Sequence, residues 1–206
     1  MKKLKILAAG DIHGDVLLAK RLAEKAKRDN VDLVILCGDL TLFDKNYRGI
    51  MGEFLNRDLK VLFVPGNHDS PTTSDLLSEI YNIKNLHDNF AIYGDVAFLG
   101  VGWANIGPYY IEEDELFKII ERNFVKINNY NIRKKVLVSH VHPSGTLIER
   151  FTSFFKGSEK LRDAIEKFNP DIVLCSHVHE AEGIEEIINN TRIINVGRHG
   201  KIIEIN

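Results

Sequence analysis

A length of 206 residues suits one domain with a sizeable core, because two halves would each lie near the lower limit of domain size; we therefore expect a single domain spanning 1–206. Hydrophobic residues make up 44% and charged residues 27%, which excludes a disordered chain, and no apolar run approaches the roughly 20 residues that cross a bilayer. The net charge of -2 comes without a basic tract, so we expect no membrane attachment and no general nucleic-acid binding.

The first apolar segment, residues 4–9, imitates a signal peptide because it follows lysines, but it is too short. It predicts a buried strand and hence a cytoplasmic protein. Cys37 and Cys175 each lie inside an apolar run, which favours two buried, reduced thiols over a disulfide or a thiolate metal site.

Apolar runs of the length of a buried strand recur along the chain, at residues 4–9, 31–37, 61–64, 96–101, 136–138 and 172–175. Helical spacing of apolar residues appears at 18–26, 116–124 and 161–168, the last preceded by Ser158 as a predicted cap and ended by Pro170. Strands that alternate with helices predict an α/β architecture whose first strands are parallel.

The C-terminal stretch predicts three consecutive strands at 183–188, 192–196 and 201–205. Asn-Asn at 189–190 and Arg-His-Gly at 198–200 have the composition of tight turns. Mixed sheets packed together and flanked by helices are the expected result.

Five of the predicted strands end in clusters of Asp, His or Asn. The ends of adjacent strands in an α/β sheet meet in one crevice, so side chains far apart in the sequence can share a site. The groups that such a site would collect are Asp11, His13, Asp39, Asn67, His140, His177 and His179.

This nitrogen and oxygen donor set suits manganese, iron or zinc rather than calcium. Seven donors exceed the needs of one tetrahedral ion, and with one shared carboxylate they suit two ions about 3.5 to 4 Å apart. Two divalent ions, two aspartates and a bridging hydroxide leave a charge of about +1, which favours a phosphate substrate over acyl chemistry.

The ordered motifs resemble those of the calcineurin-like metallophosphoesterases: Asp-x-His, Gly-Asp, Gly-Asn-His-Asp/Glu, His and Gly-His-x-His. The resemblance covers almost the whole chain and implies a four-layer α-β-β-α sandwich of two mixed sheets with outer helices. It implies two divalent transition metal ions, with manganese first and iron, zinc, nickel or cobalt as alternatives. One ion would be held by Asp11, His13, Asp39 and His179, and the other by Asp39, Asn67, His140 and His177, so that Asp39 bridges them.

His68 resembles the family's catalytic histidine, which stabilises the transition state or protonates the leaving oxygen. The resemblance implies hydrolysis of a phosphodiester by metal-activated hydroxide; a phosphomonoester of a small metabolite or nucleotide is the alternative. The nearest likeness is to small prokaryotic phosphoesterases related to cyclic-nucleotide phosphodiesterases, on residues such as 38–41 and 195–197. Asp69 would either orient His68 or cap the turn that follows.

Two positions depart from the family's patterns. Ser176 stands where Gly-His-x-His has glycine, so the turn before His177 must tolerate a side chain. Leu42 and Phe43 stand where phosphoprotein phosphatases have Asp and Arg, which argues against a protein phosphatase.

Five further residues are candidates for contact with the substrate. His142 would contact the substrate or lie on a surface loop, and Arg198 and His199 would meet a phosphate oxygen or form a solvated turn. Asn105 and Tyr109, near Trp103, would stack on a base or leaving group, or anchor the loop.

Two other classes of function are alternatives. A non-catalytic interaction module with this fold should show broken ligand motifs, and here all are present. A mononuclear metal hydrolase would differ in metal content. Formation of a homo-oligomer is left open.

Overall fold

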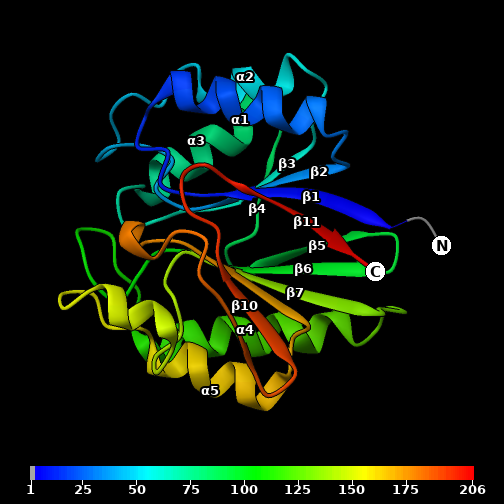
Figure 1. Cartoon of the computed structure of the whole chain (residues 1–206), viewed down its shortest axis with the longest axis vertical. Coiled ribbons are helices and arrows are strands. Elements are labelled where there is room, and N and C mark those ends of the chain that lie inside the picture. Colours follow the sequence, from blue (N-terminus) through cyan, green and yellow to red (C-terminus); the bar gives the residue numbers. More distant parts are fainter. Residues whose placement is uncertain (1–2) are drawn as a thin grey trace.

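The computed structural model describes residues 3–206 and stacks two β-sheets face to face, with helices on both outer faces (Figure 1). The first sheet contains, in spatial order, β11 (Lys201–Ile205), β1 (Leu4–Ala9), β2 (Leu33–Cys37), β3 (Val61–Val64) and β4 (Lys84–Asn85). Strands β1 to β4 are parallel, and β11 runs antiparallel to β1.

The second sheet is also mixed. Its spatial order is β5 (Asn89–Tyr93), β6 (Val96–Val101), β7 (Lys134–Ser139), β8 (Ile172–Cys175), β10 (Thr191–Asn195) and β9 (Glu185–Ile188). The four inner strands are parallel, whereas the edge strands β5 and β9 are antiparallel to their neighbours.

The helices form the two outer layers. The first sheet is covered by α1 (Val16–Arg28), α2 (Ile50–Leu55) and α3 (Pro71–Tyr81), and the second by α4 (Glu113–Ile127) and α5 (Glu159–Phe168) (Figure 1). Two short 3₁₀ helices, Leu147–Phe151 and His179–Ala181, lie in loops. The predicted four-layer α-β-β-α sandwich is thus confirmed. Within residues 3–206, no helix combines the length and apolar character that a membrane crossing needs.

Apolar side chains form three buried clusters, one between the sheets and one between each sheet and its helices. Between the sheets, Ile6 and Ile35 of the first belong to the same cluster as Phe98 and Val136 of the second. Because close-packed sheets are rigid, they hold the strand ends, and the loops that follow them, in fixed positions.

The C-terminal strands differ from the prediction in one respect. The Asn-Asn turn at 189–190 joins β9 and β10 as an antiparallel hairpin, as predicted. The segment 196–200 is not a turn between neighbouring strands, because it carries the chain from β10 in the second sheet to β11 in the first. The pairing partner of β11 is β1, nearly 200 residues away in the sequence, which local turn composition cannot reveal.

Candidate metal centre

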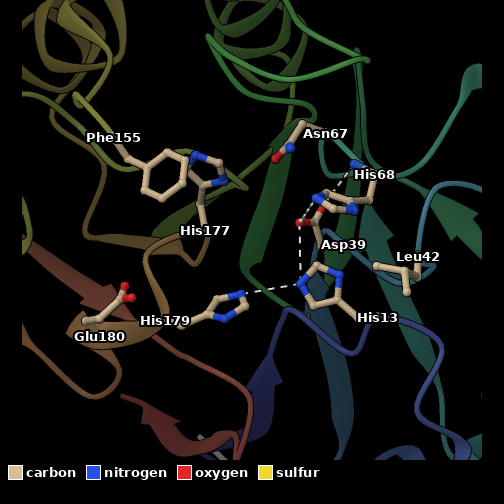
Figure 2. Close-up of a pocket in the computed structure, with 9 residues that line it drawn as sticks. All are labelled: His13, Asp39, Leu42, Asn67, His68, Phe155, His177, His179 and Glu180. Carbon is tan, nitrogen blue, oxygen red and sulfur yellow. Dashed lines mark hydrogen bonds and ion pairs between the residues drawn. The ribbon is translucent and has the colours of Figure 1, made fainter. Parts of the chain in front are cut away.

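The seven predicted ligands and His68 meet in segments that follow β1, β2, β3, β7 and β8, beside a cavity of about 340 Å³ whose lining is drawn in Figure 2. The cavity is lined by His13, Asp39, Leu42, Asn67, His68, Phe155, His177, His179 and Glu180. The two predicted ligands outside this lining, Asp11 and His140, are fully buried.

One group of donors comes from the loops after β1 and β8. The Nε2 atoms of His13 and His179 are 3.3 Å apart, and His179 Nε2 is 3.6 Å from Oδ1 of Asp11. The donor atoms of these three residues all lie within 4.8 Å of one another. The arrangement leaves room for one ion among them.

A second group combines Asp39, His140 and His177, whose donor atoms also lie within 4.8 Å of one another. Nε2 of His140 is 3.5 Å from Asp39 Oδ2 and 3.1 Å from His177 Nδ1. It is also 3.1 Å from Oδ1 of Asn67, so four predicted ligands of one ion are assembled.

Asp39 lies between the two groups. Its Oδ2 atom is 3.7 Å from Nε2 of His13 in the first group and 3.5 Å from Nε2 of His140 in the second. Burial alone would raise the pKa of Asp39, but the charges of His140 and His68 hold it well below its usual range. This carboxylate is therefore anionic and placed to contact two cations.

His140 has the hydrogen-bond arrangement of a metal ligand. Its Nδ1 atom lies 2.8 Å from the carbonyl oxygen of Cys37, so Nδ1–H donates and Nε2 of the neutral ring carries a lone pair. That lone pair faces metal-ligating atoms of Asp39, Asn67 and His177, and a positive charge among them would satisfy all four groups. Without a metal a proton supplies it: burial opposes protonation, yet Asp39 raises the pKa of His140 to about 9.

Buried polar atoms without a hydrogen-bond partner in the described part of the chain include Asp11 Oδ1 and His177 Nε2. Unsatisfied buried polar groups are costly, and Asp11 Oδ1 belongs to the first donor group, so its lack of a hydrogen-bond donor fits a site built for a cation. Imidazole nitrogens with carboxylate and amide oxygens suit divalent transition metals. The residues therefore fit a pair of such ions.

The backbone of this site is strained. Asp11, His13, Asp39 and His177 have φ angles of 52°, 49°, 51° and 71°, in the left-handed region that side chains disfavour. Such strain is held in place by surrounding structure and is concentrated at functional sites. Here it turns four of the seven predicted ligands toward one place at the ends of the strands.

His68 occupies the cavity wall beside Asp39. Its backbone N–H donates to Asp39 Oδ1 at 2.9 Å, and its Nε2 is 3.9 Å from Asp39 Oδ2. Its ring packs against Phe43, with centroids 4.0 Å apart, and against His13, at 4.8 Å. The imidazole is thus held at the cavity from two sides.

Asp69 is fully buried and binds the loop after β2 to the loop after β3. Its carboxylate accepts hydrogen bonds from the backbone N–H groups of Leu40, Thr41 and Gly66 at 2.8 to 3.0 Å, and from the Thr41 hydroxyl at 2.8 Å. Helix α3 is capped by Ser70 rather than by Asp69. Asp69 therefore positions the loops that carry Asp39, Asn67 and His68.

The turn before His177 accommodates the side chain of Ser176, which contacts a predicted metal ligand. Its hydroxyl donates a hydrogen bond to Oδ2 of Asp11, while Oδ1 of Asp11 faces His179. A side chain at Gly10 would collide with this hydroxyl, because an added Cβ would lie 2.4 Å from Ser176 Oγ. The departure from the family pattern thus places a donor directly behind a predicted ligand.

Arg198 and His199 are not among the residues that line the cavity. Nε of Arg198 donates to the backbone oxygen of Asp11 at 2.9 Å, and its guanidinium lies 3.8 Å from Asp15. His199 is exposed and lies 3.1 Å from the carboxylate of Glu182. Both side chains thus have partners within the protein, and their contact with a phosphate stays a prediction.

Asn105 and Tyr109 also lie outside the cavity wall. Asn105 donates to the backbone oxygen of Lys156 at 3.2 Å, and the Tyr109 hydroxyl donates to Asp44 at 2.5 Å, so both side chains contact other loops, and their contact with substrate stays a prediction. His142 is fully buried, so it is not a surface-loop residue, and burial lowers its pKa to about 4.

Three residues of the cavity wall were not predicted as substrate contacts: Leu42, Phe155 and Glu180. Leu42 and Glu180 each lie close to a predicted ligand in the sequence, at three positions after Asp39 and one after His179. Proximity to a motif is therefore a usable signal for these two. Phe155 follows no motif and no periodic pattern, so only the folded chain reveals it.

The sequence model of one family, described as calcineurin-like phosphoesterase, matches residues 4–181. None of the curated proteins gives a significant match.

Several solved structures have the same fold. A protein of Thermus thermophilus superposes with a TM-score of 0.76 at 17% identity, covering 100% of this chain and 99% of that chain. A dimetal phosphatase from Danio rerio gives a TM-score of 0.68 at 11% identity, covering 95% and 88%. An archaeal phosphodiesterase gives 0.56 at 18% identity, covering 98% and 99%. At these identities the likeness concerns the fold.

Proposed function

The chain belongs to the calcineurin-like phosphoesterases, and from that premise we propose that it hydrolyses phosphodiesters at a centre of two divalent metal ions. The observation that carries the proposal is the position of Asp39, whose carboxylate lies 3.5 to 3.7 Å from a histidine of each donor group. A shared carboxylate is the feature that distinguishes a paired site from two separate ones.

The proposed ligands follow from the two donor groups. Asp11, His13, Asp39 and His179 would hold one ion, and Asp39, Asn67, His140 and His177 the other. Manganese is the first choice for both, with iron, zinc, nickel and cobalt as alternatives, because all accept imidazole and carboxylate donors. When bound, such ions lower the pKa of water and neutralise the charge of phosphate oxygens.

The protein itself positions a histidine beside the proposed ions, where it can transfer a proton. His68 lies on the cavity wall, and its backbone N–H donates to Asp39, the residue that would bridge the proposed ions. We assign it the role of protonating the leaving oxygen or stabilising charge on the phosphate in the transition state.

Charge in the cavity favours a diester over a monoester. The residues that line it in the described chain include the carboxylate of Glu180 and no lysine or arginine. A monoester dianion would be repelled by Glu180 more strongly than a diester monoanion. Hydrolysis of a phosphomonoester, such as a small metabolite or a nucleotide, is the second candidate, since the same donor groups would serve it.

We further propose that the chain acts as one domain, because β11 near its end completes the sheet that β1 begins. Cys37 and Cys175 are free and buried, which is typical of a reducing compartment and supports a cytoplasmic location.

The test is an assay of purified protein with manganese, iron, nickel, zinc or magnesium against matched mono- and diester aryl phosphates, followed by cyclic nucleotides. We expect metal-dependent turnover with a preference for the diesters. The variant His68→Ala should retain bound metal and lose about 10²- to 10⁴-fold in kcat, as expected for a proton-transfer residue. Unchanged turnover in His68→Ala would remove this residue from the mechanism, and no hydrolysis of any ester would contradict the proposed function.

A further inference from the structure

Apolar side chains border opposite sides of the cavity beside the proposed metal centre. Phe155 borders it next to His177, and Leu42 borders it next to His13 and His68 (Figure 2). Metal-binding groups form its floor, so a phosphate held by them would have its ester group between these two side chains.

Phe155 is held in place by its neighbour. Its ring meets the ring of His177 edge to face, with centroids 4.8 Å apart and planes inclined at 69°. On the other side Phe43 packs against His68. A ring fixed by such contacts presents a preformed surface and loses little conformational freedom when a ligand packs on it.

The charged residues of the cavity also favour an apolar ester group. Among the residues described, Glu180 is the one charged residue that lines the cavity besides the proposed ligands and His68. Arg198, a predicted phosphate contact, donates instead to the backbone oxygen of Asp11. A substrate with a second phosphate or carboxylate would find no partner here, whereas an apolar ester group would be desolvated against carbon.

We propose that the cavity takes phosphate esters whose alcohol group is a flat apolar ring, with Phe155 and Leu42 as the specificity-determining residues. The inference rests on the proposed function, because it requires the phosphate to bind at the metal centre. A volume of about 340 Å³ lies within the range of roughly 300 to 1,000 Å³ that is typical of small-molecule sites. The ring would pack on Phe155, and Leu42 would border the opposite side of the cavity.

The inference is tested by calorimetric titration of the manganese-loaded protein with three phosphonates that share one headgroup: methylphosphonate, hexylphosphonate and phenylphosphonate. These compounds are not hydrolysed, so the measurement is of binding alone. We expect phenylphosphonate to bind roughly tenfold more tightly than methylphosphonate, and more tightly than hexylphosphonate. Equal affinities for methyl- and phenylphosphonate would overturn the inference, and a preference for the hexyl chain would overturn its claim of a ring.

Two variants distinguish the effect of the Phe155 ring on ligand binding from any effect on the metal centre. Phe155→Leu keeps apolar contact with His177 but removes the ring, and should reduce the phenyl-to-methyl ratio to about twofold with bound manganese unchanged. Phe154→Ala is the matched control, because this neighbouring ring is 82% exposed and does not border the cavity; its ratio should equal that of the parent protein. An unchanged ratio in Phe155→Leu would contradict the assignment. If no phosphonate binds and no ester is hydrolysed, the proposed function fails and the inference fails with it.

Discussion

Removal of the Asp69 carboxylate should strongly destabilise the protein. In the variant Asp69→Ala, the backbone N–H groups of Leu40, Thr41 and Gly66 lose their shared acceptor in a fully buried position. The Thr41 hydroxyl is less affected, because it also lies 3.1 Å from the carbonyl oxygen of His68.

The size of the effect follows from the number of groups left without a partner. Each buried, unsatisfied N–H costs about 1 to 3 kcal/mol, so three of them cost roughly 3 to 9 kcal/mol. Burial and the charge of Asp39 raise the pKa of Asp69 to about 6, so removing the carboxylate also relieves an unfavourable burial of charge. We therefore expect a loss near the lower end, about 3 to 5 kcal/mol, against a total stability of about 5 to 15 kcal/mol.

Urea denaturation of the metal-free protein, followed by circular dichroism, measures this loss. Asp69→Asn keeps one acceptor oxygen and should lose roughly half as much, which provides a folded variant if Asp69→Ala does not fold. Asp75→Ala, at an exposed aspartate of the following helix, is the control and should change stability by less than about 0.5 kcal/mol. A loss below about 1 kcal/mol in Asp69→Ala would refute the reasoning that this carboxylate holds the two loops together.

Two further predictions concern metal affinity and pH. Ser176→Ala removes the hydrogen bond to Asp11 and should weaken one of two manganese-binding steps by about 10- to 100-fold while leaving the other unchanged in calorimetry; equal weakening of both steps, or of neither, would contradict this. In the metal-free protein, burial lowers the pKa of His177 to about 3. Burial also disfavours protonation of His140, but Asp39 outweighs it and raises the pKa of His140 to about 9. The contribution of His177 to the free energy of unfolding therefore grows as pH rises from about 3 to 6.5, and that of His140 is lost as pH rises from about 6.5 to 9, so thermal stability should peak near pH 6.5. Bound metal replaces the proton on His140, so the decline above about pH 6.5 should disappear in the metal-loaded protein; a decline of the same size would argue against metal at this residue.

Much of the fold could be predicted because local sequence patterns, such as apolar runs and helix caps, identify its strands and helices. The continuous apolar runs of β1, β2 and β3 identified buried strands, and Ser158 was confirmed as the cap of α5, where it accepts from the N–H of Leu161. The short strand β4 contains only Lys84 and Asn85, which no strand pattern identifies, and β5 was missed as well. β4 forms by pairing with β3, which lies about 20 residues earlier, and β5 forms a hairpin with β6, so both strands depend on their neighbours rather than on their own composition.

The candidate site was predictable to the extent that it lies at strand ends. Side chains that follow parallel strands directly, such as Asp39 and Asn67, were expected to meet, and the structure brings them together. The direction of a side chain on a longer loop depends instead on tertiary contacts. Arg198 contacts the backbone of Asp11 and Tyr109 contacts Asp44, and neither contact has a signature in the sequence.

The most direct test of the whole interpretation is the number of metal ions that the protein holds. Purified protein supplied with manganese or iron and then freed of unbound metal should contain two ions per chain by elemental analysis, and Asp39→Ala should lose both, because the bridging carboxylate also offsets repulsion between the ions. A parent protein that binds no metal, or an Asp39→Ala variant that keeps two tightly held ions, would contradict a centre built around this residue.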